Sequence, residues 1–273
     1  MSDDDSFRLS RRKALTALGT VGVASAGAGL GTSAYFNDTE TLDNNSLTAG
    51  QLDLAVEYAT DVDQEQNDEE PVTGTVNGNP GAYSYAISDV KPGDQGKLAF
   101  CPTIVDNPAW LYVGTKDGLV DKEGGKTEPE KDVDDTPGGE LSKKIQVRVS
   151  YADDVKTNHD GGDNDSDDDI KCTNKTKIFR GTLKELFAQI EDGYLLDGNR
   201  EKSGRQPYPA SGDHEDQTGP CLCMKWWVPT GVGNVIQTDG VEFDFQFTAL
   251  QERHNGSPEN PFSSSSTSTN SST

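Results

Sequence analysis

The sequence holds one run of side chains that suits a metal ion, the acidic stretch at residues 160–169. Aspartates recur at alternate positions within it, and calcium prefers hard oxygen ligands of this kind. The pattern therefore indicates a calcium site whose ligands would be Asp163, Asp165 and Asp167. Because the stretch lacks the glutamate that ends an EF-hand loop, a solvated acidic loop without a bound ion is an equally good interpretation.

Cysteines are the second group of residues that could do chemistry. There are four of them, which allow three disulfide pairings: Cys101, Cys172, Cys221 and Cys223. Cys221 and Cys223 are two residues apart, so both thiols face one side of a strand and a bond between them would be strained. Each is therefore expected to reach another strand. No second cysteine pair or nearby histidine supports a zinc site, so we favour disulfides over a metal site or free buried thiols.

The histidines and the common catalytic motifs give no support to an enzyme. His159, His214 and His254 form no His-Glu-x-x-His motif. The sequence also has no Gly-x-Ser-x-Gly elbow, no P-loop and no Rossmann fingerprint. It therefore predicts a protein that is not an enzyme.

The charge of the chain argues against one class of partner and indicates the kind of solution in which the protein works. Its 47 acidic residues against 24 Lys and Arg give a net charge of −23, which repels phosphate backbones and argues against nucleic acid as a partner. The acidic excess runs through the expected loops, which favours a halophilic protein whose self-repulsion is screened by concentrated salt. An ordinary acidic protein is the alternative.

The N-terminus predicts export. Arg11 and Arg12 precede an uncharged stretch rich in Ala and Gly at residues 14–34, which is typical of a twin-arginine signal peptide read by the Tat translocase. Small residues end this stretch, so we expect cleavage between Ala34 and Tyr35. A buried N-terminal helix is the alternative, but the stretch has no polar face at helical spacing. We therefore expect residues 1–34 to be removed and the protein to be secreted, either extracellular or at the cell surface.

The rest of the chain has the pattern of short strands. Apolar residues alternate with polar ones and are separated by turn residues, which predicts an all-β, jelly-roll-like β-sandwich with long acidic loop insertions. Residues 60–80 are expected to be turn-rich and residues 114–141 to form a surface insertion. One short helix is predicted after a capping box of Thr182 and Glu185. The expected strands cover residues 52–58, 83–87, 110–113, 145–151, 222–228 and 241–247, with a further strand opening at residue 98.

Two segments after the expected cleavage site resemble a known family. Residues 35–41 read Tyr-Phe-Asn-Asp-Thr-Glu-Thr, and residues 44–54 read Asn-Asn-Ser-Leu-Thr-Ala-Gly-Gln-Leu-Asp-Leu. This order and spacing resemble the start of mature TasA and camelysin proteins, which a SipW-type signal peptidase processes. Later segments, among them residues 106–111 and 193–198, are similar to the haloarchaeal branch of the family. Glu252 stands where that branch leads us to expect a cysteine, so a family disulfide at this position is in doubt.

The resemblance implies a jelly-roll subunit that polymerises head to tail into extracellular fibres, either a biofilm matrix fibre or a bundling pilus. In such fibres the N-terminal segment of one subunit completes a sheet of the next, which is β-augmentation. Here residues 35–51 would be the donor-strand segment, with Phe36, Leu42 and Leu47 as its plugs. Residues 52–262 would form the β-sandwich domain, and the Ser/Thr-rich residues 263–273 a disordered tail.

Three alternatives stay open. The donor segment could fold back as an edge strand of its own subunit. The protein could then be a monomeric cell-surface or S-layer-associated binding module. A camelysin-like secreted metallopeptidase is a further alternative, although the motif for it is lacking.

Overall fold

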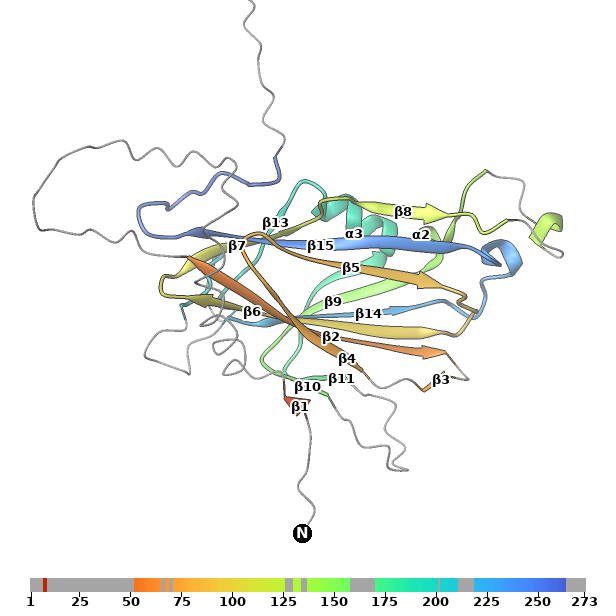
Figure 1. The fold of residues 1–273 in the computed structure, drawn as a ribbon, viewed down its shortest axis with the longest axis horizontal. Helices are drawn as coiled ribbons and strands as arrows, with labels where there is room; N and C mark the ends of the chain where they lie inside the picture. The colour runs from red at the N-terminus through yellow and green to blue at the C-terminus, as the bar shows by residue number, and fades with distance from the viewer. Residues whose placement is uncertain are drawn as a thin grey trace, which may run out of the picture.

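The computed structural model describes residues 7–8, 52–64, 67–68, 71–125, 130–133, 137–157, 170–200, 202–210 and 219–263. Its main body is two antiparallel sheets that lie face to face (Figure 1). The seven-stranded sheet has the order β12-β9-β14-β6-β2-β3, and β4 also pairs with β2. Its strands are β2 (Asp53–Gln64), β3 (Asn67–Asp68), β4 (Val72–Asn77), β6 (Gln95–Val105), β9 (Gln146–Ala152), β12 (Thr176–Thr182) and β14 (Cys221–Trp227).

The five-stranded sheet is built around one long strand, β15. On one side β15 pairs with β5, and on the other side it pairs first with β8 and then with β7, which in turn pairs with β13. The strands of this sheet are β5 (Gly81–Ser88), β7 (Ala109–Gly114), β8 (Leu119–Lys122), β13 (Tyr194–Leu195) and β15 (Gly240–Gln251).

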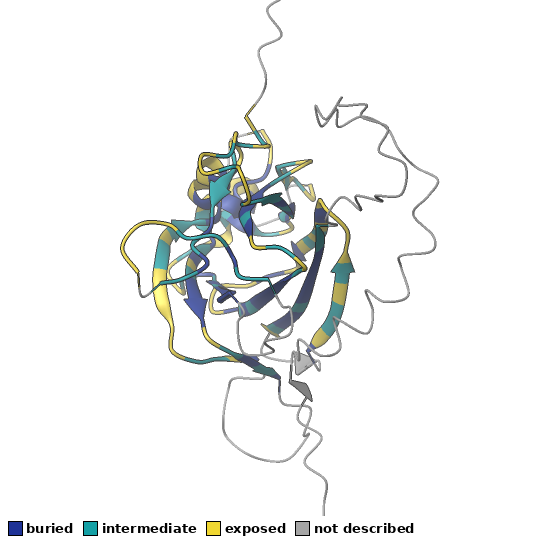
Figure 2. Ribbon diagram, turned by 90° about the vertical axis from the view of Figure 1, so that its left-hand side faces the viewer, coloured by how far each residue is buried: buried dark blue, intermediate teal, exposed yellow. Residues whose placement is uncertain are grey.

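The inner faces of the two sheets form the core. On β15 the alternating residues Phe243, Phe245 and Phe247 are all buried, and the last two rings lie 5.3 and 5.4 Å from that of Phe100 on β6. Burying one such ring contributes about 2–3 kcal/mol. Figure 2 shows the buried residues concentrated in the central strands and the exposed ones on edge strands and loops. The predicted all-β sandwich class is confirmed.

A third, small sheet lies beside the seven-stranded sheet and is joined to it by one disulfide. It consists of β1 (Phe7–Arg8), β10 (Val155–Thr157) and β11 (Ile170–Cys172). Cys101 bonds to Cys221 between β6 and β14, and Cys172 of β11 bonds to Cys223. The sequence left three pairings open. Two of them join each thiol of the Cys-x-Cys pair to another strand, and the structure has one of these two.

One helix begins at the predicted cap, and a second helix is present that the sequence did not predict. Helix α3 (Leu183–Ile190) begins after Thr182, whose side chain accepts from the amide of Glu185 while the Glu185 carboxylate accepts from the amide of Thr182. Its apolar face is buried against the sheets, as predicted. A second helix, α2 (Leu141–Lys144), was not predicted, because four residues are too few for a periodic pattern. None of the helices in the described part of the chain is long and apolar enough to span a membrane.

Two regions that the sequence indicated as loops contain paired backbone. Within residues 60–80, β2 continues to Gln64 and β4 follows, because cross-strand polar partners replace the apolar pattern: Asp61 lies opposite Lys97, and the Gln95 amide donates to Asp63. Within residues 114–141, β8 pairs with β15. The single-turn helices η1 (Glu130–Asp132) and η2 (Asn234–Ile236) lie near the end of β8 and the start of β15 (Figure 1). The surface-insertion prediction was wrong for these parts.

Candidate functional site

The residues that the sequence singled out divide into two groups. The export and donor residues and the predicted calcium ligands lie outside the described part of the chain, so their predictions stay predictions. The four cysteines lie inside it and are all paired. The undescribed residues are Arg11, Arg12, Ala34, Tyr35, Phe36, Leu42, Leu47, Asp163, Asp165 and Asp167.

An open sheet edge with an apolar cleft beside it is the first candidate site. Strand β12 pairs with β9 on one side, and no described strand pairs with its other side. The cleft opens next to β12 between the two sheets and has a volume of about 50 Å³. Its lining comes from β12, β9, β14, β6, α3, β7, β13 and β15, and is apolar apart from Gln189 and Tyr194. We call β12 and this cleft together the edge cleft.

A β-bulge in β12 explains why two consecutive residues line the edge cleft. The register of β12 against β9 shifts between Lys177 and Phe179. A bulge of this kind breaks the strict alternation of faces. Ile178 and Phe179 therefore both line the cleft, and both are half-buried. The edge thus exposes apolar surface beside unpaired backbone groups, which is the combination that pairs with a further strand.

The size and chemistry of the edge cleft limit what it can hold. A dry cavity of about 150 Å³ lined by aliphatic side chains holds a benzene ring. The edge cleft is smaller, so it admits the end of one aliphatic or aromatic side chain at a time. Among the described residues no carboxylate, histidine or cysteine lines it, so they offer no group for acid–base or nucleophilic chemistry.

A row of basic side chains ends at this edge, although the chain as a whole is acidic. On β12, Lys177 and Arg180 are exposed. Arg180 lies opposite Arg148 of β9, which in turn lies opposite Lys225 of β14. Like charges directly opposite one another weaken a sheet. In a protein of net charge −23, such a row favours contact with an acidic segment.

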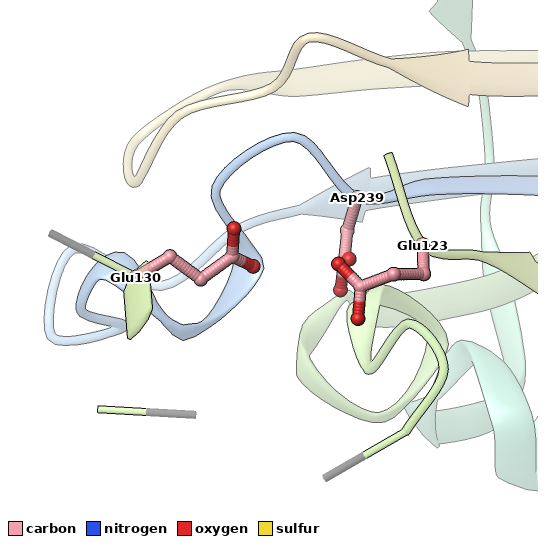
Figure 3. A group of neighbouring side chains, drawn as sticks. All are labelled: Glu123, Glu130 and Asp239. Atoms are coloured by element: carbon pink, nitrogen blue, oxygen red, sulfur yellow. The ribbon is translucent and has the colours of Figure 1, made fainter. Parts of the chain in front are cut away.

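A cluster of carboxylates at the start of β15 is the second candidate site (Figure 3). Oxygen atoms of Glu123, Glu130 and Asp239 all lie within 4.8 Å of one another. Glu130 is fully buried and Asp239 is 2% exposed. We call these three residues the carboxylate cluster. Carboxylate oxygens at such spacing are able to share one hard cation.

Strand pairing and close loop packing assemble the carboxylate cluster. Gly240 of β15 lies opposite Lys122 of β8 in an antiparallel pair. Asp239 precedes Gly240 and Glu123 follows Lys122, so both residues lie at the same end of the two strands. Gly124 lets the next loop approach, because a Cβ atom there would come within 2.0 Å of the Thr238 carbonyl.

Buried Asp244 of β15 fixes the turn that leads into β8. It accepts hydrogen bonds from the Thr115 hydroxyl and from the amides of Lys116 and Asp117 at 2.8–2.9 Å.

The carboxylate cluster is electrostatically unfavourable by itself. Burial above all, and then the charges of Glu123, Glu130 and Glu140, raise the pKa of Asp239 to about 6, against the opposing hydrogen bond from the Glu140 amide. Two carboxylates about 4.5 Å apart repel by roughly 3–4 kcal/mol at an effective dielectric constant of about 20. Because the folded pKa lies above the ordinary value, ionisation of Asp239 removes stability as the pH rises from about 4 through 6.

Sequence reasoning missed the carboxylate cluster because its members are far apart in the chain. Glu123 and Glu130 were assigned to the surface insertion at residues 114–141, Asp239 was given no role, and only the strand register brings Glu123 beside Asp239. The alternating residues 241–247 were the available signal for one of the two strands, but residues 119–122 do not alternate and gave no signal for the other. No such signal places Glu130, which lies on the single turn η1.

Comparison with known proteins adds no relative: no protein-family model matches the chain, and no curated protein matches it.

Proposed function

We propose that the chain is a secreted structural subunit of extracellular filaments, in which the donor segment of one subunit, residues 35–51, adds a strand to the next subunit at the edge cleft. The single observation that carries this proposal is the open edge of β12 beside an apolar cleft. Added backbone hydrogen bonds would supply affinity, and side chains entering the cleft would supply specificity.

The donor segment fits the edge cleft in length and apolar content. It directly precedes β2, and its first 13 residues reach about 43 Å when extended, ample for the seven residues of β12. Phe36, Leu42 and Leu47 offer single apolar side chains of the size that the cleft admits.

The charge of the donor segment also fits. Between residues 35 and 47 it carries Asp38, Glu40 and Asp43 and no basic residue. These carboxylates would meet the basic row that ends at Arg180. Complementary charge of this kind would set the register and speed encounter of the two subunits.

Export and processing belong to the same proposal. The twin-arginine signal would carry the chain out of the cell, and the two disulfides are of the kind that persists in oxidising compartments. Cleavage between Ala34 and Tyr35 by a SipW-type peptidase would free the donor segment, so that assembly follows processing. A donor arm that enters the next copy and never closes a ring generates a filament.

Deleting residues 35–47 from the mature protein tests the proposal. We expect negative-stain electron microscopy to show filaments of the parent protein and only monomers of the deletion variant, with the melting temperature of the monomer unchanged. A synthetic peptide of residues 35–51 is expected to bind the deletion variant in calorimetry. Filaments that persist after the deletion would sink the proposal.

A matched pair of variants separates the plugs from the segment as a whole. Changing Phe36, Leu42 and Leu47 to Ser removes the plugs, whereas changing Asn44 and Asn45 to Ser leaves them in place. We expect only the first variant to lose assembly. A parent protein that stays monomeric under all conditions would instead favour the surface-binding module.

A further inference from the structure

Buried oxygen atoms without hydrogen-bond partners distinguish the carboxylate cluster from an ordinary acidic loop. Both carboxylate oxygens of Glu123, one of Glu130 and one of Asp239 are buried and accept no hydrogen bond. The side-chain oxygen of Gln237, two residues before Asp239, is in the same condition. Native structures leave very few buried acceptors unpaired, so several at one place indicate a missing positive partner.

Two donors close to the carboxylate cluster have other partners. The Thr238 hydroxyl has one hydrogen to donate, and it lies 2.8 Å from the Gly125 carbonyl but 3.3 Å from Glu130. Lys122 forms an ion pair with Glu242, on the strand that β8 pairs with. Lys122, the residue next to Glu123, therefore pairs with a carboxylate outside the cluster.

We propose that Glu123, Glu130 and Asp239 bind a calcium ion that fixes the segment from β8 to η1 against the start of β15. Calcium takes six to eight oxygen ligands at 2.3–2.6 Å, so two of its ligands stand up to about 5 Å apart. Oxygens that all lie within 4.8 Å of one another meet this condition.

The chemistry of the carboxylate cluster selects calcium among the common metal ions. Its ligands are all oxygens, whereas zinc prefers the nitrogen and sulfur of His and Cys. Magnesium keeps several of its waters, and the burial of Glu130 and Asp239 leaves little room for a water shell. Calcium exchanges its waters for protein oxygens more readily.

The bound ion would join three stretches that are separate in the chain. Glu123 directly follows β8, Glu130 lies on η1, and Asp239 directly precedes β15. The ion would replace mutual repulsion by shared attraction and so hold this end of the sandwich closed. This inference is independent of the proposed filament, because none of the three residues lies at the edge cleft.

Thermal unfolding of the mature protein in concentrated KCl tests the calcium site, after chelation and after addition of calcium or magnesium. We expect millimolar calcium to raise the melting temperature by about 5 °C or more and magnesium to raise it less. Equilibrium dialysis is expected to show loss of one bound calcium per chain in Glu130→Gln and in Asp239→Asn.

Glu130→Gln gives the sharpest readout because its effect changes sign. In chelator it removes one of three like charges, so the variant is expected to melt above the parent protein. In calcium it removes a ligand, so the variant is expected to melt below the parent protein. A variant that is more stable than the parent protein in both conditions overturns the proposal.

Three controls separate the carboxylate cluster from the remaining acidic groups of the chain. Glu242→Gln removes a nearby exposed carboxylate and should leave the calcium response intact. Changing Asp163, Asp165 and Asp167 to Asn tests the acidic loop; if this change alone abolishes binding, the proposed site is wrong. Glu123→Gln, at a half-exposed position, replaces the buried variants if they do not fold. Stabilisation by KCl alone, with none added by calcium, also overturns the proposal.

Discussion

The edge cleft and the carboxylate cluster share no residue, and they differ in the kind of contact that each lacks. At the edge cleft, half-buried Ile178 and Phe179 expose carbon surface, and leaving each partly exposed costs only about 1 kcal/mol. At the carboxylate cluster, buried oxygens repel one another by several kcal/mol. A monomer therefore tolerates an empty edge cleft at little cost, whereas a counter-charge at the carboxylate cluster would offset a repulsion inside the fold. The comparison predicts that the first region controls assembly and the second controls stability.

The largest expected effect comes from placing a charge in the edge cleft. Ile178→Asp would bury an unpaired carboxylate under the incoming strand, at a cost of about 3 kcal/mol or more, so the critical concentration for assembly should rise at least about 100-fold. The melting temperature of the monomer should change little, because Ile178 is only half-buried. Pelleting assays and electron microscopy measure the assembly.

Val72→Asp is the matched control for this variant. Val72 is also an aliphatic residue on an edge strand, β4, and is 59% exposed, but it does not line the edge cleft. Assembly should survive this change. The reverse result, with assembly lost in Val72→Asp and kept in Ile178→Asp, would move the acceptor edge to β4.

Calcium removal should have a smaller effect that is largest near the ligands. If the ion holds β8 and η1 to the start of β15, chelation should speed amide hydrogen exchange in residues 119–122, 130–132 and 239–240 by about 10- to 100-fold. Amides of β12 and α3 should lose much less protection, because neither element carries a ligand. Uniform loss of protection across the sandwich would break the proposed division between the two regions.

The same two regions show how far the sequence reaches. Alternating residues such as those of β15 predicted the core strands, since one buried face imposes a period of two. Strands with polar partners, such as the pairing of Asp61 with Lys97, were missed because nothing in their own composition separates them from a loop. The edge cleft was beyond prediction in detail, since it depends on a bulge in β12. The carboxylate cluster was beyond prediction because long-range register alone unites Glu123 with Asp239.

The smallest expected effect is a loss of stability at alkaline pH, which depends on the phenol of Tyr151. Tyr151 of β9 is buried, and its hydroxyl accepts from the Asp197 amide at 2.8 Å. Burial above all raises its pKa from 10.0 to about 12, with smaller contributions from Asp197 and Tyr194 and opposing ones from the Asp197 amide and Arg205. A folded pKa above the unfolded value means stability that is present below pH 10 and lost as the pH rises toward 12.

Tyr151→Phe isolates this contribution from the other buried tyrosines. From pH 9 to 11 the parent protein should lose about 1 kcal/mol more stability than the variant, since one pKa unit corresponds to about 1.4 kcal/mol. Urea unfolding at each pH measures the difference, and the slope is compared because the variant also loses the acceptor for Asp197. Parallel pH profiles would show that Tyr151 ionises as freely in the folded chain as in the unfolded one. In that case the surroundings of Tyr151 would be more hydrated than its burial indicates, and the contrast with the carboxylate cluster would weaken.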